Sequence, residues 1–371
     1  MKDLSSRKHA SAWLRIDLGA LAANYNIFKT LALPGCKVAG VIKADGYGLG
    51  VDQVFAALET QSCPFYFLAT LDEALHIRRL TKKPVAVLGG LYKGAEDIYC
   101  HENILPVLNS LEDISNWQKK ASTLGIKLPA LLHFDTGMNR LGLDAQEAQT
   151  LCRDPARISG LDILYLISHF SCADEKNHPA TKVQYDKFVK ISSFFPAVKK
   201  SLANSSGSFR AKEYHFDLLR PGMALYGLNP VPEQENPMKP VVRLDTRILQ
   251  IRSVIKNETV GYGETYRFDK NTRLATVALG YADGFLRSLG NSTNDRKAVL
   301  YYNGIACPVV GRVSMDAVTL DIGHLDPCPV AGETMEVIGA HQTADDLATA
   351  AGTIGYEILT SLGSRYFREY C

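Results

Sequence analysis

The sequence predicts an α/β fold, in which a (β/α)8 barrel of the TIM type is followed by a mainly β domain. Three observations predict it. Apolar β-branched runs alternate with amphipathic segments between residues 37 and 228, a proline-rich stretch follows, and the remaining sequence is rich in Val, Ile, Thr and Tyr between Gly, Pro and Asn turns. A chain of 371 residues is long enough for two domains.

Eight short apolar runs mark the expected barrel strands. They span 38–42, 65–68, 85–88, 104–108, 130–134, 161–167, 201–203 and 216–219. The segments between them place apolar residues three and four apart, which indicates helices at 71–80, 111–124, 145–152 and 181–194, after a first helix at 18–31. Strand-helix alternation repeated eight times favours a closed barrel over an open sheet. The run 12–16 has no barrel position, and we expect it to pair with the later sheet.

A domain boundary is expected near residue 238. The stretch 229–240 holds four prolines and no periodicity, which is typical of a linker. We therefore divide the chain into a barrel over residues 1–238 and a β domain over 239–371. In the second domain strands are expected at 241–255, 273–279, 298–310, 317–322 and 334–338, with one closing helix at 345–362.

Charge and composition exclude several classes of function. Lys and Arg number 41 against 39 Asp and Glu, with no long run of one sign, so no basic stripe is available for nucleic acid. The opening segment 1–12 is polar, and no stretch reaches the ~18 apolar residues that a bilayer requires. We expect a cytoplasmic protein with no membrane partner. The eight cysteines form no C-x-x-C pair, so we expect reduced thiols and no metal site.

Polar residues gather at the carboxyl ends of the predicted strands, where TIM barrels place their active sites. They are Lys43, Asp135, Arg140, His169, Asn204, Ser205 and Arg220. Taken singly, a histidine at a strand end is more often structural, and an arginine before proline is often a surface residue. Together they predict a cationic pocket that takes a small molecule.

Lys43 is the most informative of these residues. Its side chain begins next to an apolar run, where an ammonium group loses its proton more easily, so it is a Schiff-base candidate. The glycines within 46–50 allow a tight loop, but Val51 and Gln53 stand where a dinucleotide fingerprint needs glycine. The later turns 204–207 and 221–222 offer N–H groups and hydroxyls to a phosphate, although such turns are common without function. The combination indicates pyridoxal 5'-phosphate.

The motifs around these residues resemble those of the bacterial alanine racemases. AGVIKADGYGLG at 39–50 matches the highly specific lysine signature of that family. The likeness continues in family order through DTGMNRLG at 135–142, SHFSCAD at 168–174, ANS at 203–205, RPGMALYG at 220–227, GYG at 261–263, GYADG at 280–284, GRVSMD at 311–316 and GYE at 355–357. It spans nearly the whole chain.

The resemblance implies a pyridoxal-phosphate isomerase that interconverts L-alanine and D-alanine, a homodimer whose sites combine one subunit's barrel with its partner's β domain. Lys43 and Tyr262 would be the two catalytic bases. The implied cofactor-binding residues are Lys43, Tyr47, His169, Asn204, Ser205, Arg220, Gly222 and Tyr356. Arg140 and Met315 would bind substrate, and the surrounding or entrance residues would be Asp174, Tyr281, Arg312, Asp316 and His133.

Three positions depart from the commoner family pattern. His133 stands where many relatives have a carbamylated lysine that braces the arginine matched by Arg140. Ser201 replaces a frequent histidine behind Arg220, and Ser314 replaces a frequent cysteine. The first two leave open what supports the two arginines.

Two bases on opposite faces of the substrate would exchange its Cα proton. Lowering the pKa of a phenol from about 10 to about 7 requires roughly 4 kcal/mol of stabilisation of the phenolate. Our hypothesis is that Arg220 acting with His169 provides this stabilisation to Tyr262. The product would be D-alanine for peptidoglycan. The alternatives are a racemase of another small amino acid such as serine, a pyridoxal-phosphate decarboxylase of basic amino acids, and a cofactor-carrier barrel.

Overall fold

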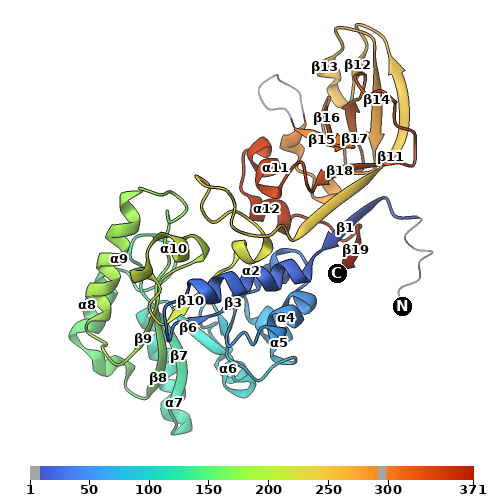
Figure 1. Ribbon diagram of the computed structural model, residues 1–371. Helices are drawn as coiled ribbons and strands as arrows, with labels where there is room; N and C mark the ends of the chain where they lie inside the picture. Colours follow the sequence, from blue (N-terminus) through green and yellow to red (C-terminus); the bar gives the residue numbers. More distant parts are fainter. Residues whose placement is uncertain (1–8, 291–297) are drawn as a thin grey trace.

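The computed structural model describes residues 9–290 and 298–371 and places a barrel at one end of the molecule and a β domain at the other (Figure 1). Most of the polar opening segment lies outside these residues. Within the described parts of the chain, no helix is both long and apolar enough to cross a bilayer.

Seven parallel strands follow one another around the barrel in sequence order. They are β3 (Gly40–Val41), β4 (Tyr66–Leu68), β5 (Val85–Val87), β6 (Leu105–Leu108), β7 (Leu128–His133), β8 (Leu161–Ile167) and β9 (Lys199–Ser201). An eighth strand, β10 (Leu218–Leu219), pairs in parallel with β2 (Lys37–Val38), the segment just before β3. The Arg220 N–H also donates to the Ala203 carbonyl at 3.1 Å, which joins β10 to the end of β9. The barrel therefore closes, and the predicted fold class is confirmed.

Helices cover the outside of the barrel. They are α2 (Leu18–Leu31), α4 (Val51–Thr60), α5 (Leu71–Arg78), α6 (Glu96–Glu102), α7 (Leu111–Leu124), α8 (Ala145–Arg153), α9 (Pro179–Ser192) and α10 (Ser205–Arg210). Capping boxes begin two of them: Thr70 with Glu73 starts α5, and Asp144 with Glu147 starts α8. These local hydrogen bonds explain why both helices begin where the sequence pattern places them.

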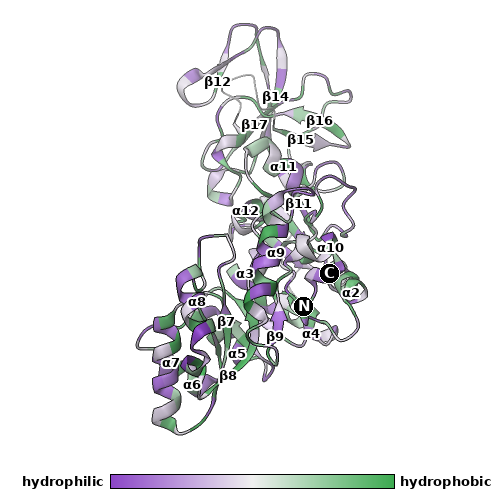
Figure 2. Cartoon of the chain, turned by 90° about the vertical axis from the view of Figure 1, so that its left-hand side faces the viewer, coloured by the Kyte–Doolittle hydropathy of each residue, from purple (hydrophilic) through white to green (hydrophobic). Residues whose placement is uncertain are grey.

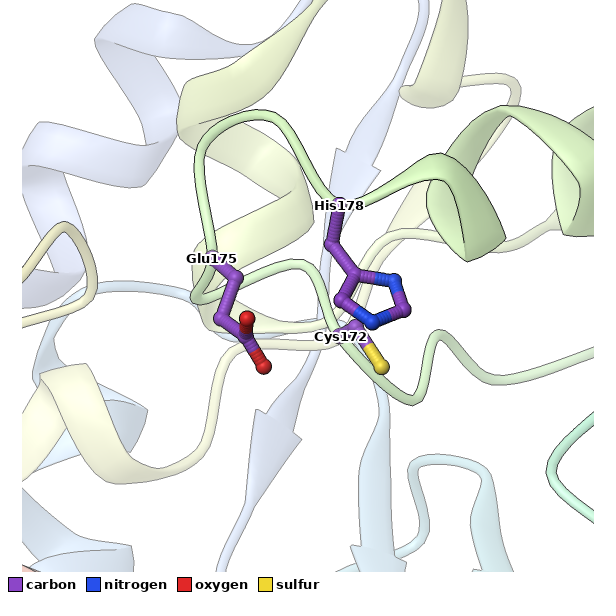
Figure 3. Close-up of side chains that lie close together, drawn as sticks. All are labelled: Cys172, Glu175 and His178. Atoms are coloured by element: carbon purple, nitrogen blue, oxygen red, sulfur yellow. The ribbon is translucent and has the colours of Figure 1, made fainter.

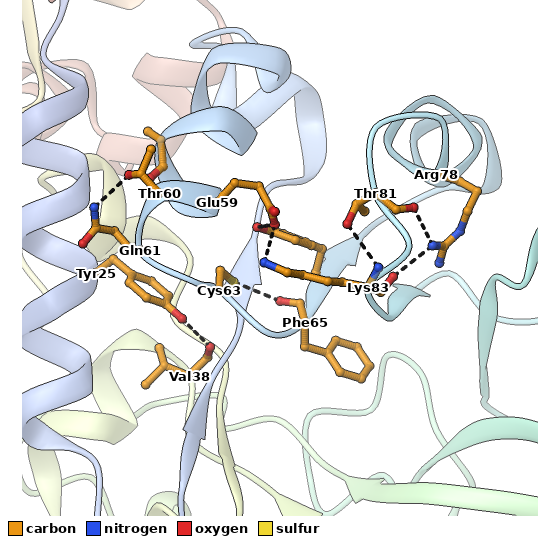
Figure 4. Close-up of polar contacts among 12 residues, drawn as sticks. Tyr25, Val38, Glu59, Thr60, Gln61, Cys63, Phe65, Arg78, Thr81 and Lys83 are labelled. Atoms are coloured by element: carbon orange, nitrogen blue, oxygen red, sulfur yellow. Dashed lines mark hydrogen bonds and ion pairs between the residues drawn. The ribbon is translucent and has the colours of Figure 1, made fainter.

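Polar contacts attach the first helices to the barrel strands (Figure 4). Tyr25 of α2 donates its hydroxyl hydrogen to the Val38 carbonyl at 2.7 Å. Lys83 Nζ lies 2.8 Å from Glu59 Oε1, and Arg78 donates to the Lys83 carbonyl at 3.0 Å. Inside the barrel, apolar side chains such as stacked Phe65 and Phe67 form a separate core. Helices on the outside and apolar side chains on the inside thus hold the strands at whose ends the polar residues lie.

The β domain is built around the 13-residue strand β11 (Val242–Val254). Its sheets also contain β1 (Ala12–Ile16), β14 (Thr272–Val277), β15 (Val299–Tyr302), β16 (Ile305–Pro308), β17 (Val318–Asp321), β18 (Thr334–Ile338) and β19 (Phe367–Tyr370). Strand β1 pairs antiparallel with β11 and parallel with β19. The β domain therefore incorporates strands from both ends of the chain.

Two parts of the β domain differ from the sequence-based expectation. The expected strand at 298–310 is a hairpin, because Asn303 and Gly304 both adopt positive φ and reverse the chain. A further short hairpin, β12 (Thr259–Val260) with β13 (Tyr266–Arg267), was not expected. The 3-10 turn η4 (Tyr262–Glu264) connects its strands.

The prediction of a single closing helix is wrong. The chain forms two helices, α11 (Ala344–Ala351) and α12 (Gly355–Thr360). Gly352 between them has a φ of 74° and ends α11 with a left-handed cap, as glycine often does. Helix α12 then lies against the loop that follows the first barrel strand, where any Cβ on Gly48 would clash with the Leu359 carbonyl.

Candidate active site

Lys43 begins a turn with an unusual backbone. The segment α3 (Lys43–Tyr47) is not a regular right-handed helix, because Ala44, Asp45, Gly46 and Tyr47 have φ values of 53°, 54°, 60° and 55°. A left-handed conformation costs a non-glycine residue about 1–2 kcal/mol. The sequence-based interpretation attributed the tight loop to glycines, yet three of these four residues have side chains. Such strain is concentrated at functional sites.

Hydrogen bonds hold this strained turn in place. The Ala44 N–H donates to Glu73 Oε1 at 2.7 Å, and the Val51 N–H donates to Asp45 Oδ1 at 2.8 Å. The Gly50 N–H also donates to the Asp45 carbonyl, at 2.9 Å. Two carboxylates thus hold the backbone of the turn that follows the lysine. Sequence patterns gave no reason to select Glu73 for this role.

The Lys43 side chain is half-buried at the end of the first barrel strand. Burial, followed by the positive charge of Arg140, lowers the pKa of Lys43, and the opposing effect of Glu73 is smaller. Its amine therefore reaches the neutral, nucleophilic form at a lower pH than a free lysine does. This is the property that a Schiff-base lysine needs.

Arg220 lies directly after β10 and is only 5% exposed. It donates to Ser201 Oγ at 2.5 Å and to the carbonyl of Ser168. Burial lowers the pKa of Arg220 to about 10, which leaves the guanidinium charged at neutral pH. Ser201, one of the departures from the family pattern, thus supplies a direct hydrogen bond behind this arginine.

His169 follows β8 beside this arginine. Burial, followed by the charge of Arg220, lowers the pKa of His169 well below its ordinary value. The ring is therefore neutral at working pH. In the pair of Arg220 and His169 that our hypothesis invokes, the arginine is therefore the charged member.

His133 lies at the end of β7 and is also neutral. Burial, followed by the charge of Arg220, lowers the pKa of His133 to about 3. Its Nδ1 lies 2.7 Å from Asn109 Oδ1, while the Asn109 amide nitrogen donates to the Val107 carbonyl at 3.1 Å. Because the amide is oriented in this way, Nδ1 carries the ring hydrogen and Nε2 is left as an acceptor.

A cluster of polar groups follows β9 and β10. Ser205 Oγ accepts hydrogen bonds from the Gly222 N–H at 3.0 Å and the Ala224 N–H at 3.3 Å. A Cβ on Gly222 would clash with the Tyr47 hydroxyl, so only glycine leaves room there. Tyr47 is held by its stacking on Tyr226, with ring centroids 4.4 Å apart. Burial raises the pKa of Tyr47, which keeps its hydroxyl a neutral donor.

Asn204 and Tyr356 lie next to this cluster, since Asn204 precedes Ser205 and Tyr356 acts on the pKa of Tyr47. Asn204 caps α10, since its Oδ1 accepts the Gly207 N–H at 2.9 Å. Burial, followed by the charge of Asp174, raises the pKa of Tyr356, and Arg140 lowers it. The phenol of Tyr356 therefore lies among the charged groups expected at the entrance, and it is contributed by α12 of the same chain.

The β-domain residues implied by the resemblance form a second, separate set. The exposed fractions are 72% for Tyr262, 52% for Met315 and 43% for Tyr281. Arg312 and Asp316 are also exposed. We call these five residues the β-domain rim.

Backbone contacts connect the segments of the β-domain rim. The Tyr281 N–H donates to the Ser314 carbonyl at 3.1 Å. Next to the Tyr262 turn, a Cβ on Gly263 would approach the Arg312 guanidinium to 3.0 Å. Arg365, which the sequence analysis did not select, lies 2.6 Å from carboxylate oxygens of both Asp316 and Asp283.

The structure does not bring the β-domain rim to Lys43 of the same chain. Tyr262 lies on the β12–β13 hairpin, at the end of the β domain that is remote from the barrel in both views (Figures 1 and 2). The other residues of the predicted site instead lie together at the barrel. They are Lys43, Arg220, His169, His133, Tyr47, Ser205, Gly222 and Tyr356. A single chain therefore contains the two halves of the predicted site at separate places.

Comparison with known proteins identifies the family. Residues 16–230 match the family model of the alanine racemase N-terminal domain, and residues 241–370 match that of the C-terminal domain. The chain belongs to the alanine racemase family. The resemblance found in the motifs is thereby confirmed over almost the whole sequence.

Relatives and solved structures agree with this membership. A protein of Mesorhizobium japonicum named "Alanine racemase, catabolic" is 43% identical, over 98% of this chain and 94% of its own length. An alanine racemase of Brucella canis is also 43% identical, over 97% and 94%. The crystal structure of alanine racemase from Bartonella henselae, described as having covalently bound pyridoxal phosphate, aligns with a TM-score of 0.93 at 37% identity over 98% and 100%.

Proposed function

We propose that this protein interconverts L-alanine and D-alanine with pyridoxal 5'-phosphate as its cofactor. The reaction moves the Cα proton from one face of the substrate to the other, using Lys43 on one side and Tyr262 of the partner subunit on the other. The observation that carries the proposal is the half-buried Lys43 with a lowered pKa, fixed beside Arg140 at the end of the first barrel strand. Membership of the alanine racemase family supports it.

The barrel residues fit this cofactor. The Gly222 position, which has no room for a Cβ beside Tyr47, and the hydroxyl of Ser205 suit a phosphate group. The positive charges of Arg220 and Arg140, which together with the larger effect of burial lower the pKa of His169, suit an anionic ligand. Lys43 would hold the cofactor, and the bound cofactor would delocalise the negative charge left at Cα when the proton is removed.

Arg220 sets the electrostatics of the proposed site. It would face the pyridine nitrogen and keep its own protons, because a guanidinium with a pKa of about 10 remains charged at neutral pH. The nitrogen would then stay unprotonated, which favours return of the proton to Cα over transamination. With His169 neutral, Arg220 is also the group whose charge would stabilise the phenolate form of Tyr262 contributed by the partner.

We also propose that the active form is a homodimer with shared sites. Tyr262 is 72% exposed and lies far from the barrel of its own chain, so it can reach a lysine only in another copy. Met315 and Tyr281 are exposed on the same rim and would be covered together. Closed two-fold symmetry would let each barrel receive the other chain's rim.

The proposed substrate is small because two phenols, those of Tyr262 and Tyr356, would crowd the space next to Cα. A pocket that fits a methyl group rejects a hydroxymethyl group by only about 1–3 kcal/mol, so slow turnover of serine is expected. We propose that the enzyme works in the cytoplasm and supplies D-alanine for the cell wall. Relatives from Mesorhizobium japonicum and Agrobacterium fabrum are named catabolic, whereas a Pseudomonas aeruginosa structure is named biosynthetic, so a D-alanine requirement in a deletion strain is the test of this role.

The activity can be tested with purified, cofactor-loaded enzyme. Each enantiomer of alanine should be converted to the racemic mixture, as followed by chiral chromatography, and L-serine should react more slowly. L-lysine and L-ornithine serve as controls for decarboxylation. Release of carbon dioxide from these substrates without racemisation of alanine would contradict the proposed function.

A further inference from the structure

The loop between β8 and α9 brings together three side chains that the proposed reaction does not use. Cys172 Sγ, a carboxylate oxygen of Glu175 and a ring nitrogen of His178 all lie within 4.8 Å of one another. Figure 3 shows the three side chains directed toward one space, with a ring nitrogen of His178 facing the cysteine sulfur. No metal site was expected from the sequence, because its cysteines are not closely paired.

The backbone places these residues on the same side of the loop. The Glu175 N–H donates to the Cys172 carbonyl at 3.2 Å, and the His178 N–H donates to the Glu175 carbonyl at 3.3 Å. Each of these two successive turns joins residues that are three positions apart in the sequence. The side chains of residues 172, 175 and 178 therefore lie on one side of the loop. The Thr181 hydroxyl also donates to the Cys172 carbonyl, at 3.2 Å, which attaches the loop to α9.

Arg210 attaches the same loop to α10. Its Nε donates to the Ala173 carbonyl at 2.6 Å, and its guanidinium also donates to the Asp174 carbonyl. The backbone of the loop is therefore held by hydrogen bonds from the side chains of Thr181 and Arg210. In the described part of the chain, no hydrogen bond or ion pair is found to the Glu175 carboxylate.

We propose that Cys172, Glu175 and His178 are the three protein ligands of a Zn²⁺ site. A thiolate, an imidazole and a carboxylate are each common Zn²⁺ ligands, whereas Mg²⁺ and Ca²⁺ prefer oxygen alone. A fourth position would be open to water, because Glu175 is exposed on the surface. None of the three ligands is a base of the proposed reaction. A failure of one proposal would therefore leave the other unaffected.

The imidazole imposes a condition on this site. His178 Nδ1 now accepts the Ala180 N–H at 3.2 Å, as part of the cap of α9. For the other nitrogen to bind Zn²⁺, the ring hydrogen must move to Nδ1, and this hydrogen bond is then lost. Binding also removes a proton from the Cys172 thiol. Affinity should consequently rise with pH and be lower than at a site whose histidine is already held in the required tautomer.

Titration with Co²⁺, a spectroscopic substitute for Zn²⁺, tests the site directly. The tagless, cofactor-loaded enzyme is first freed of excess cofactor, which could itself bind metal. We expect one Co²⁺ per subunit, with a sulfur-to-cobalt charge-transfer band in the near ultraviolet that added Zn²⁺ removes. The band should be lost in Cys172→Ser, and affinity should fall at least tenfold in Glu175→Gln and in His178→Asn, which keeps a cap acceptor for α9.

Cys371→Ser, which removes an exposed cysteine elsewhere, is the matched control and should bind Co²⁺ as the unmodified enzyme does. Circular dichroism checks that each variant folds, and Glu175→Gln changes an exposed side chain, so at least one variant should remain informative. The proposal is overturned if the enzyme shows no charge-transfer band, or if binding persists unchanged in Cys172→Ser and Glu175→Gln.

Discussion

The barrel residues of the proposed site and the β-domain rim differ in how far a single chain buries them and holds them in place. At the barrel, Lys43 and Arg220 are at least half-buried and surrounded by hydrogen bonds that hold the neighbouring backbone or the side chain itself. At the β domain, Tyr262 and Met315 are 72% and 52% exposed. A single chain thus preorganises the cofactor half of the proposed site, and in our proposal another copy positions the second half.

The largest effect should come from the barrel side. Lys43→Ala should lower turnover of alanine at least about 10³-fold, because it removes both the proposed cofactor attachment and one base. The visible absorbance of the lysine-bound cofactor should also disappear. Lys37→Ala, at the exposed start of the same strand region, is the control. An unchanged visible spectrum in Lys43→Ala would exclude this lysine.

The next effect concerns the β-domain rim. Tyr262→Phe should lower turnover by about 10²- to 10⁴-fold while cofactor absorbance is kept. Full racemisation must slow equally in both directions, because the two enantiomers have equal free energies. Exchange of the Cα hydrogen with solvent deuterium separates the bases: D-alanine should still exchange through Lys43, and L-alanine should not. Tyr266→Phe in the same hairpin is the control, and equal exchange of both enantiomers would contradict the two-base assignment.

A smaller effect is expected behind Arg220. Ser201→Ala leaves one donor of a buried guanidinium without its acceptor, which should destabilise the folded protein by about 1–3 kcal/mol. Urea unfolding at fixed protein concentration measures this, with Ser193→Ala on the exposed end of α9 as the control. If Ser201→Ala is as stable as Ser193→Ala, the hydrogen bond from Arg220 to Ser201 Oγ does not contribute to the stability of the folded protein.

The smallest effect is a pH dependence of stability from His133. Its pKa falls from 6.5 to about 3 on folding, so the unfolded chain binds a proton more readily between these values. The neutral ring therefore contributes fully to stability above pH 6.5, and the contribution is lost as pH falls toward 3. His133→Gln should lose less stability than the unmodified protein between pH 6.5 and 5.5, by about 1 kcal/mol. Parallel stability curves would be evidence against a buried neutral ring.

Much of the fold could be predicted because its signals are local. The strand at 334–338 was located to the residue, and capping residues such as Thr70 and Asp144 mark helix starts in the sequence itself. The closing helix was misjudged because apolar spacing continues across Gly352, whose left-handed cap interrupts it. Gly352 itself was the available signal, because glycine is the common residue at such helix ends.

The site could be predicted in part. Residue types and strand ends selected Lys43 and Arg220, but not the carboxylate of Glu73, whose bond to the Ala44 N–H depends on tertiary packing. The left-handed turn could not be predicted either, since residues such as Ala44 and Tyr47 carry no preference for it. The cluster at Cys172 depends on two successive turns in a loop, which composition does not reveal.

Mixing two inactive variants tests the shared site most directly. Lys43→Ala and Tyr262→Phe subunits are unfolded together and refolded, so that subunits pair at random. In a hybrid dimer, Lys43 of one chain would meet Tyr262 of the partner subunit at one intact site. With half of the dimers hybrid and one site of two intact, activity should recover to about a quarter of the unmodified enzyme's. If each tyrosine served its own chain, no hybrid would hold an intact site, and activity would not recover.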